Sequence, residues 1–112
     1  MQLLLMVLNK VEKLDDLLEA LMAKGICGAT ILSSTGMVRE LGKRIEDYPI
    51  FGTLRYLIDF ERKESKTIFM VLKDEQVDTV RKIVREVVGD LSQPDTAILF
   101  ILPILSAEGV GF

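Results

Sequence analysis

The chain has 112 residues, which is enough for one hydrophobic core and too few for two. Apolar residues make up 49% of it and charged residues 28%, a balance typical of a folded globule and not of a disordered segment. The formal net charge is -3 without a basic cluster, so we expect no nucleic acid polymer as a partner, because phosphate neutralisation supplies much of that affinity. The composition predicts one domain over residues 1–112.

The apolar runs are too short to cross a membrane. The longest, Leu3 to Leu8 and Ala97 to Leu105, fall well short of the ~20 residues that a spanning helix needs. Met1 leads straight into the first run, without the basic stretch or the cleavage site of a signal peptide. We expect Cys27 to be a buried thiol, since it has no cysteine or histidine partner. These features predict a cytoplasmic protein without membrane insertion.

A strand pattern followed by a helix pattern occurs twice along the chain. The apolar segments Leu3–Leu8 and Thr67–Leu72 are each followed by apolar residues at helical spacing. The spacing predicts helices over residues 11–24 and 74–88, with charged residues outside the apolar stripe. Two stacked β-α units are therefore expected.

Each helix pattern is followed by a glycine and then by another strand. Gly25 and Gly89 stand where a left-handed residue would end the helix. Cys27–Ser34 and Ala97–Leu102 are the predicted strands, and Pro103 should lie at a strand end or an edge. The order predicts an α+β fold: a ferredoxin-like βαββαβ sandwich, with an antiparallel sheet and two helices on one face.

The predicted first, third and fourth strands are apolar almost continuously, whereas a sheet with one face in water should alternate. Two helices can cover only one face. A copy of the same sheet on the other face is the simplest cover, so we expect a homo-oligomer. The alternative is that residues 38–65 fold back over the sheet.

The segment at about 36–65, here called the insert, is longer than a hairpin turn and longer than most structureless loops. Its charged start, Arg39–Arg44, predicts a flexible reporter. The more apolar part, Pro49–Phe60, has the spacing of a short amphipathic helix that packs against the body. We expect function to be concentrated in the insert, including contact with a protein target through residues 38–65.

Several segments resemble the nitrogen regulatory PII family and its PII-like relatives, which are homotrimeric signalling proteins with a double βαβ fold. The resemblance covers most of the chain unevenly. It is carried by the opening strand, Lys13–Leu21, Gly25–Thr30, Gly36–Arg39 and Phe100–Pro103. It implies a homotrimer that binds a small-molecule effector in clefts between subunits and reports through the loop after its second strand.

The resemblance also implies which residues contact the effector. Gly28 and Thr30 would lie beside a ligand's base. Gly36, Met37 and Arg39 would stand at the root of the insert, with the Arg39 guanidinium offering a planar fork of donors to a phosphate or carboxylate. Structural explanations stay open as well, because Arg39 could pair with a nearby glutamate, Glu40 or Glu46, and Thr30 could be an ordinary strand residue.

The chain departs from the ATP-binding PII proteins in its basic residues. Those proteins have a glycine-rich turn and a lysine before the last strand, and a basic tail. Here the turn is Ser92–Ala97, Ile98 replaces the lysine, and residues 106–112 include no base. A triphosphate would be poorly compensated, so we expect a less charged effector or a degenerate site, and the cofactor stays unknown. Tyr48 and Tyr56 do not match the family's modified tyrosine.

We do not expect an enzyme. The chain has no histidine and no serine in a nucleophile-elbow motif. Its carboxylates have structural explanations, either on a solvated helix face or at a helix start. These residues are Asp15, Asp16, Glu19, Asp74, Glu75 and Asp78. The alternative functions are a ligand-free structural oligomer and a metal-binding protein similar to the CutA family, with carboxylates holding a hard cation.

Overall fold

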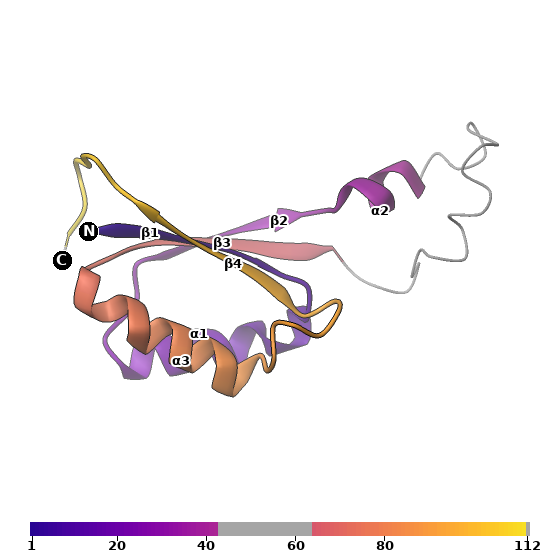
Figure 1. The fold of residues 1–112 in the computed structure, drawn as a ribbon, viewed down its shortest axis with the longest axis horizontal. Coiled ribbons are helices and arrows are strands. Elements are labelled where there is room, and N and C mark those ends of the chain that lie inside the picture. Colours follow the sequence, from indigo (N-terminus) through magenta and orange to yellow (C-terminus); the bar gives the residue numbers. More distant parts are fainter. Residues whose placement is uncertain (43–63, 112) are drawn as a thin grey trace.

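The computed structural model describes residues 1–42 and 64–111 (Figure 1). Over this part the βαββαβ order expected from the sequence is confirmed, with one additional short helix, α2. The elements are β1 (Gln2–Leu8), α1 (Leu14–Ala23), β2 (Ala29–Ser34), α2 (Met37–Gly42), β3 (Ser65–Leu72), α3 (Val77–Val87) and β4 (Ala97–Pro103). Short 3-10 turns, Val11–Lys13 and Asp74–Gln76, lead into α1 and α3.

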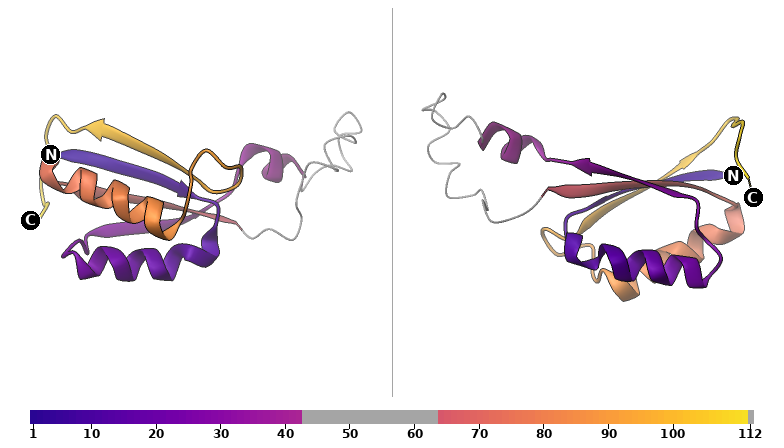
Figure 2. Two further views of the ribbon diagram at one scale, coloured as in Figure 1. Left: turned by 60° about the horizontal axis from the view of Figure 1, so that its bottom comes forward. Right: turned by 180° about the vertical axis from the view of Figure 1, so that it is seen from behind.

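The strands form one four-stranded antiparallel sheet in the order β2-β3-β1-β4. Helices α1 and α3 lie next to each other on one face of this sheet (Figures 1 and 2). This is a ferredoxin-like α+β fold. None of the described helices is long and apolar enough to span a membrane.

Left-handed glycines end both long helices, as their positions in the sequence indicated. Gly25 has φ +76° and Gly89 has φ +107°. At the end of α1 the Ile26 N–H donates to the Leu21 carbonyl at 3.0 Å, and the Gly25 N–H donates to the Met22 carbonyl at 2.9 Å. This pair of bonds is a Schellman motif, which satisfies carbonyls that the helix leaves unpaired and turns the chain back toward the sheet.

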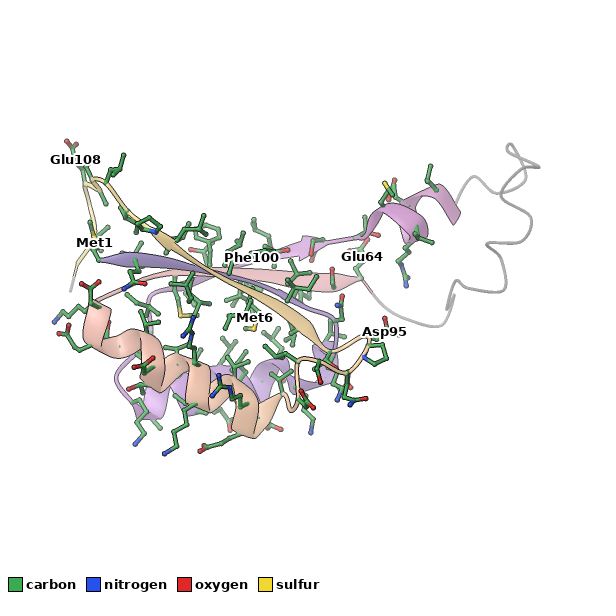
Figure 3. All side chains as sticks on the ribbon, in the orientation of Figure 1. Met1, Met6, Glu64, Asp95, Phe100 and Glu108 are labelled. Carbon is green, nitrogen blue, oxygen red and sulfur yellow. The ribbon has the colours of Figure 1, made fainter. Side chains whose placement is uncertain are left out.

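The core lies between the sheet and the two helices (Figure 3). Alternate residues of the central strand β1 are fully buried in it: Leu4, Met6 and Leu8 are each 0% exposed. The partners are alternate residues of β3 and the inward stripes of both helices. They include Ile68, Met70 and Leu72 from β3, Leu17 and Leu21 from α1, and Val77, Val80, Ile83 and Val84 from α3.

The other face of the sheet is apolar too, and no described helix covers it (Figure 1). We call it the open face. The strand registers place on it Leu3, Leu5, Val7, Leu32, Phe69, Val71, Ile98, Phe100 and Leu102. Phe100 is 48% exposed and Ile98 is 51% exposed. The sheet is therefore apolar on both faces, as the continuous apolar character of its strands indicated, and helices α1 and α3 cover only one of them.

Two local expectations differ from the structure. Cys27 is exposed, and β2 begins only at Ala29, so the predicted burial of this thiol was wrong. The reason is that Cys27 lies in the link between the end of α1 and the sheet, before the first β2–β3 pair, Ala29 with Met70. Residues Met37–Gly42 form α2, where a flexible charged segment was expected. The predictions for Lys43, Arg44, Glu46, Tyr48, Pro49–Phe60 and Tyr56 lie outside the described residues.

Candidate functional site

The residues that the resemblance assigns to an effector site fall into two groups at opposite ends of β2. Gly28 and Thr30 are at its start, whereas Gly36, Met37 and Arg39 follow its end. A strand rises about 3.3 Å per residue, which separates Thr30 from the far end of β2 by roughly 13 Å. One chain therefore does not bring the two groups together.

The first group lines a pocket of about 520 Å³. Gly28 and Thr30 form one side of it together with Cys27, the end of β3 forms another, and Gly109–Gly111 of the C-terminal segment close a third. A Cβ added at Gly28 would meet no heavy atom within 4 Å. Packing within the chain therefore does not require glycine there, and the backbone is open to an approaching ligand or a second subunit.

Lys73 is the charged side chain among the described residues that line this pocket. Sequence reasoning did not select it. It directly follows the apolar strand β3, and its backbone N–H donates to Gln76 Oε1 at 2.9 Å as the chain turns into α3. The sequence could have indicated Lys73 by its position one residue after an apolar strand, because the loops that follow strands commonly carry the polar groups of a site. The pocket is otherwise built from backbone and small or apolar side chains.

The second group centres on Arg39 of α2. Its Nε and Nη1 atoms are shielded from water and have no hydrogen-bond partner among the described residues. Pairing with Glu40, one of the structural explanations, does not supply that partner, and Glu46 lies outside the described residues. A shielded N–H without an acceptor is costly. Arg39 thus points to an acceptor that the described part of the chain does not provide.

Hydroxyl groups join β2 to β3 at the root of the insert. Ser34 Oγ and Ser65 Oγ are 2.9 Å apart, and Thr67 Oγ1 donates to Ser34 Oγ at 2.8 Å. Beside them Lys66 Nζ donates to Ser33 Oγ at 2.9 Å. These contacts fix the strand register immediately before α2.

The turn before β4 carries negative charge where ATP-binding PII proteins are basic. Asp90 Oδ1 accepts hydrogen bonds from the Ser92 N–H at 2.9 Å and from Ser92 Oγ at 2.8 Å. The backbone bond and then the hydroxyl bond hold the pKa of Asp90 below its usual value. Ile98, in place of the family's lysine, belongs to the open face. The turn thus offers no compensation for a triphosphate.

The other acidic residues have structural positions. Asp15, Asp16 and Glu19 are exposed on α1, as expected. Asp74 Oδ1 lies 2.7 Å from the Met1 amino group and accepts from Gln2 Nε2 at 3.2 Å, and these hydrogen bonds lower its pKa. Within residues 1–42 and 64–111, no three metal-ligating side chains gather at one point.

Comparison with models of known protein families gives no match, and comparison with curated proteins gives none either. The βαββαβ order and the four-stranded antiparallel sheet are nevertheless compatible with the PII-like architecture that the sequence resembles.

Proposed function

We propose that this chain is a PII-like regulatory protein that assembles as a homotrimer, binds a small effector between subunits and reports through the insert. The observation that carries this proposal is the separation of the two residue groups along β2. Each group has part of a site: a pocket with open backbone at Gly28, and an unsatisfied guanidinium at Arg39. A second copy of the chain can place one group against the other.

The open face supports the assembly. Its apolar side chains are half-buried or exposed in one chain. Complete burial of a large apolar side chain contributes about 1.5–3 kcal/mol, so removing several of them from water outweighs the entropy lost on association. Closed symmetry lets each copy cover the open face of the others. Three copies is the number that the resemblance implies.

The effector should be a small anion with a flat or apolar part. The described pocket lining offers Lys73 and backbone groups, and the second subunit would add Arg39. Asp90, ionised at neutral pH, disfavours a ligand with several negative charges near the turn. Monoanions and dianions, including cyclic nucleotides, 2-oxo acids and bicarbonate, fit this balance better than ATP.

Regulation would act through α2. A helix of six residues is too short to be stable alone, so one contact can shift its equilibrium. An effector that accepts a hydrogen bond from Arg39 would favour the helical state and thereby change what the insert presents to a target. Such differential contact is the requirement for coupling between two sites. In this proposal the protein performs no catalysis.

Limited trypsin digestion tests this function. We expect early cuts at Lys43 or Arg44, which follow the helical and shielded Arg39, before any cut within Thr53–Phe60, and slower early cuts when an effector binds. Candidate effectors are adenine nucleotides, cyclic nucleotides, bicarbonate and 2-oxo acids. Arg39→Gln should abolish protection at Lys43 and Arg44, while Lys82→Gln, an equal charge change on α3, should leave it intact. The proposal fails if no effector alters cleavage, or if an effective one acts equally on Arg39→Gln.

A further inference from the structure

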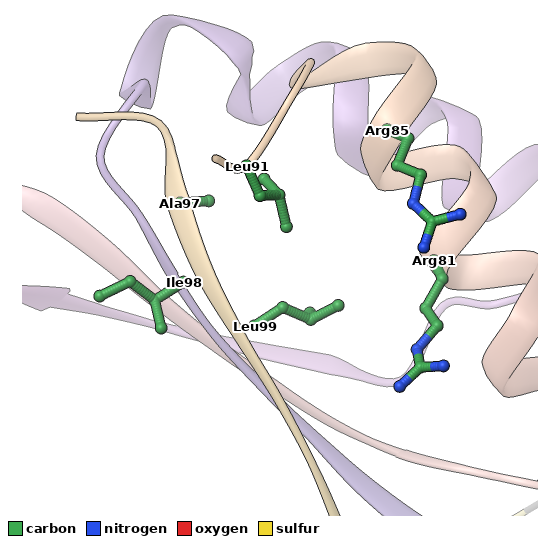
Figure 4. A pocket seen from close by; sticks show the side chains of 6 residues that line it. All are labelled: Arg81, Arg85, Leu91, Ala97, Ile98 and Leu99. Carbon is green, nitrogen blue, oxygen red and sulfur yellow. The ribbon is translucent and has the colours of Figure 1, made fainter. Parts of the chain in front are cut away.

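A groove runs along the outer edge of β4, on the helix side of the sheet. It has a volume of about 480 Å³, and its described lining consists of Arg81 and Arg85 on α3 and Leu91, Ala97, Ile98 and Leu99 opposite them (Figure 4). It belongs to neither residue group of the effector site. Arg85 also lines an adjoining hollow along Gly89–Ser92.

β4 is an edge strand whose outer backbone groups have no partner strand among the described residues. The Asn9 N–H donates to the Thr96 carbonyl and the Ile104 N–H donates to the Met1 carbonyl, so even-numbered residues bond to β1. Antiparallel pairing alternates, and the N–H and C=O groups of odd-numbered residues, such as Leu99, therefore point outward. β4 also has no charged residue to discourage pairing with another strand.

Neither arginine forms an ion pair with a described residue, and the carboxylate that shares a hollow with Arg85 is Asp90, which accepts its hydrogen bonds from Ser92. Arg81 and Arg85 are exposed, lie four residues apart on one side of α3, and have no ion pair or hydrogen bond to any residue that the structure describes. Like charges at this spacing repel each other slightly. Figure 4 shows both side chains across the groove from Leu99. The groove thus combines unpaired backbone groups with unpaired positive charge.

We propose that this groove binds an extended acidic segment of a partner protein, which adds to β4 as a fifth strand. Alternate residues of a strand are about 6.6–6.8 Å apart on one face. Arg81 and Arg85 are separated by about 6 Å of helix rise, at ~1.5 Å per residue. Two acidic side chains separated by one residue therefore match the two guanidinium groups, and each can form a charge-assisted hydrogen bond.

The residue between the two acids is apolar in this proposal. It points to the opposite side of the added strand, where it extends the open face beside Ile98 and Phe100. The recognised pattern is therefore acidic, apolar, acidic. A second copy of β4 is a poor occupant, because antiparallel pairing of two β4 edges would set the arginines of one copy beside those of the other. The other free edge, β2, has no acidic residue.

Fluorescence polarisation of the full chain with a labelled Thr-Glu-Val-Glu-Val-Glu-Thr peptide tests the charge pattern. The peptide should bind, and a version with lysine in place of glutamate should not. Replacing both arginines, Arg81→Ser with Arg85→Ser, should weaken binding at least about tenfold, since two charge-assisted contacts are lost. Lys82→Ser removes one charge from α3 outside the groove and should have little effect. Equal binding of the peptide by the natural chain, the double arginine variant and Lys82→Ser would overturn the proposal.

Amide hydrogen exchange tests strand addition itself. Peptide binding should protect the amides of Leu99 and Ile101 and leave those of Ile98 and Phe100 unchanged, because the latter already bond to β1. Two N-methylated peptides extend this test, one methylated at its glutamates and the other at its valines. One of them should lose binding and the other should keep it, because only alternate N–H groups of the added strand point toward β4.

Three further outcomes would overturn the proposal. Protection of Leu99 and Ile101 in the free protein would show that the edge is already occupied without the peptide. Displacement of the peptide by millimolar inorganic phosphate, with unchanged amide exchange, would identify a simple anion site. Equal tolerance of both N-methylated peptides would rule out strand pairing. None of these results depends on an effector, so the proposed function can fail or succeed separately.

Discussion

Leu5 and Phe69 are direct partners across β1 and β3, and both side chains lie on the open face. Leu4, the neighbour of Leu5, points the other way and is 0% exposed in the core. One step along a central strand therefore separates a side chain that stabilises the fold from one that should stabilise the assembly.

Leu5→Asp should give a folded chain that no longer assembles. A charge on the open face is hydrated in one chain but would be buried and unpaired between copies. Light scattering should show about three chains per particle for the natural sequence and one for the variant, with helix content retained. Phe69→Asp should behave alike. A variant that assembles normally and resists heat equally well would contradict this, as would a natural sequence that is monomeric at micromolar concentration.

Leu4→Asp is the matched change on the core side. It places a carboxylate among buried apolar residues without a partner, so it should unfold the chain rather than release folded monomers. Circular dichroism should show lost helix content at 25 °C. Equal behaviour of Leu4→Asp and Leu5→Asp would show that the two faces of β1 are not distinguished in this way.

Core residues of α1 should contribute measurably to the stability of the fold. Leu17 on α1 is 0% exposed and belongs to the core cluster. Leu17→Ala should lower the free energy of unfolding by about 2–5 kcal/mol, measured by urea denaturation, because the cavity cannot close fully. Glu19→Ala, two residues further on the solvated side of α1, should change it by less than ~0.5 kcal/mol.

The fold could be predicted because its determinants are local and repeated. Apolar spacing defined both helices, Gly25 and Gly89 marked their ends, and the continuous apolar strands indicated a sheet that is apolar on both faces. Boundaries shifted by one to three residues, mainly because the 3-10 turns before α1 and α3 continue the helical pattern. Hydrophobic periodicity does not separate such a turn from the helix it precedes.

The candidate site could be predicted only in part. Gly28 through Arg39 are close in sequence, but an extended strand lies within that stretch and puts its two ends far apart. The exposure of Cys27 and the part of Gly109–Gly111 in the pocket depend on where β2 begins and where the chain goes after β4. Both features depend on the tertiary path of the chain, which the local pattern of residues does not determine.

Ser34→Ala should loosen the root of the insert. Ser34 Oγ is in contact with Ser65 Oγ and accepts from Thr67, so its removal leaves both hydroxyls with fewer partners. We expect a loss of about 1 kcal/mol and faster amide exchange at Ser65 and Lys66 than elsewhere in the sheet. Unchanged exchange there would mean that backbone pairing alone fixes the register. Ser33→Ala, whose hydroxyl contacts only Lys66 among the described residues, is the control.

The carboxyl of Asp90 should titrate below the ordinary aspartate value of about 3.9. Because its folded-state pKa is lowered, its contribution to stability is present above the unfolded pKa and is lost as pH falls through the folded pKa. NMR titration should show Ser92→Ala raising that pKa toward the ordinary value, because the variant loses the hydroxyl donor. A pKa unaffected by the substitution would assign the lowered value to the Ser92 backbone N–H and the Gln93 side chain.

The position of β1 in the sheet also bears on how the chain acquires its structure during synthesis. β1 is made before β3 and β4, the two strands that pair with it in the sheet. The apolar residues of β1 therefore stay unpaired while the ribosome adds about 5–20 residues per second. Of its two partners, β4 is synthesised after β3. Pairing of this kind has high contact order and forms slowly. A ribosome that stalls before β4 therefore leaves one side of β1 without a partner.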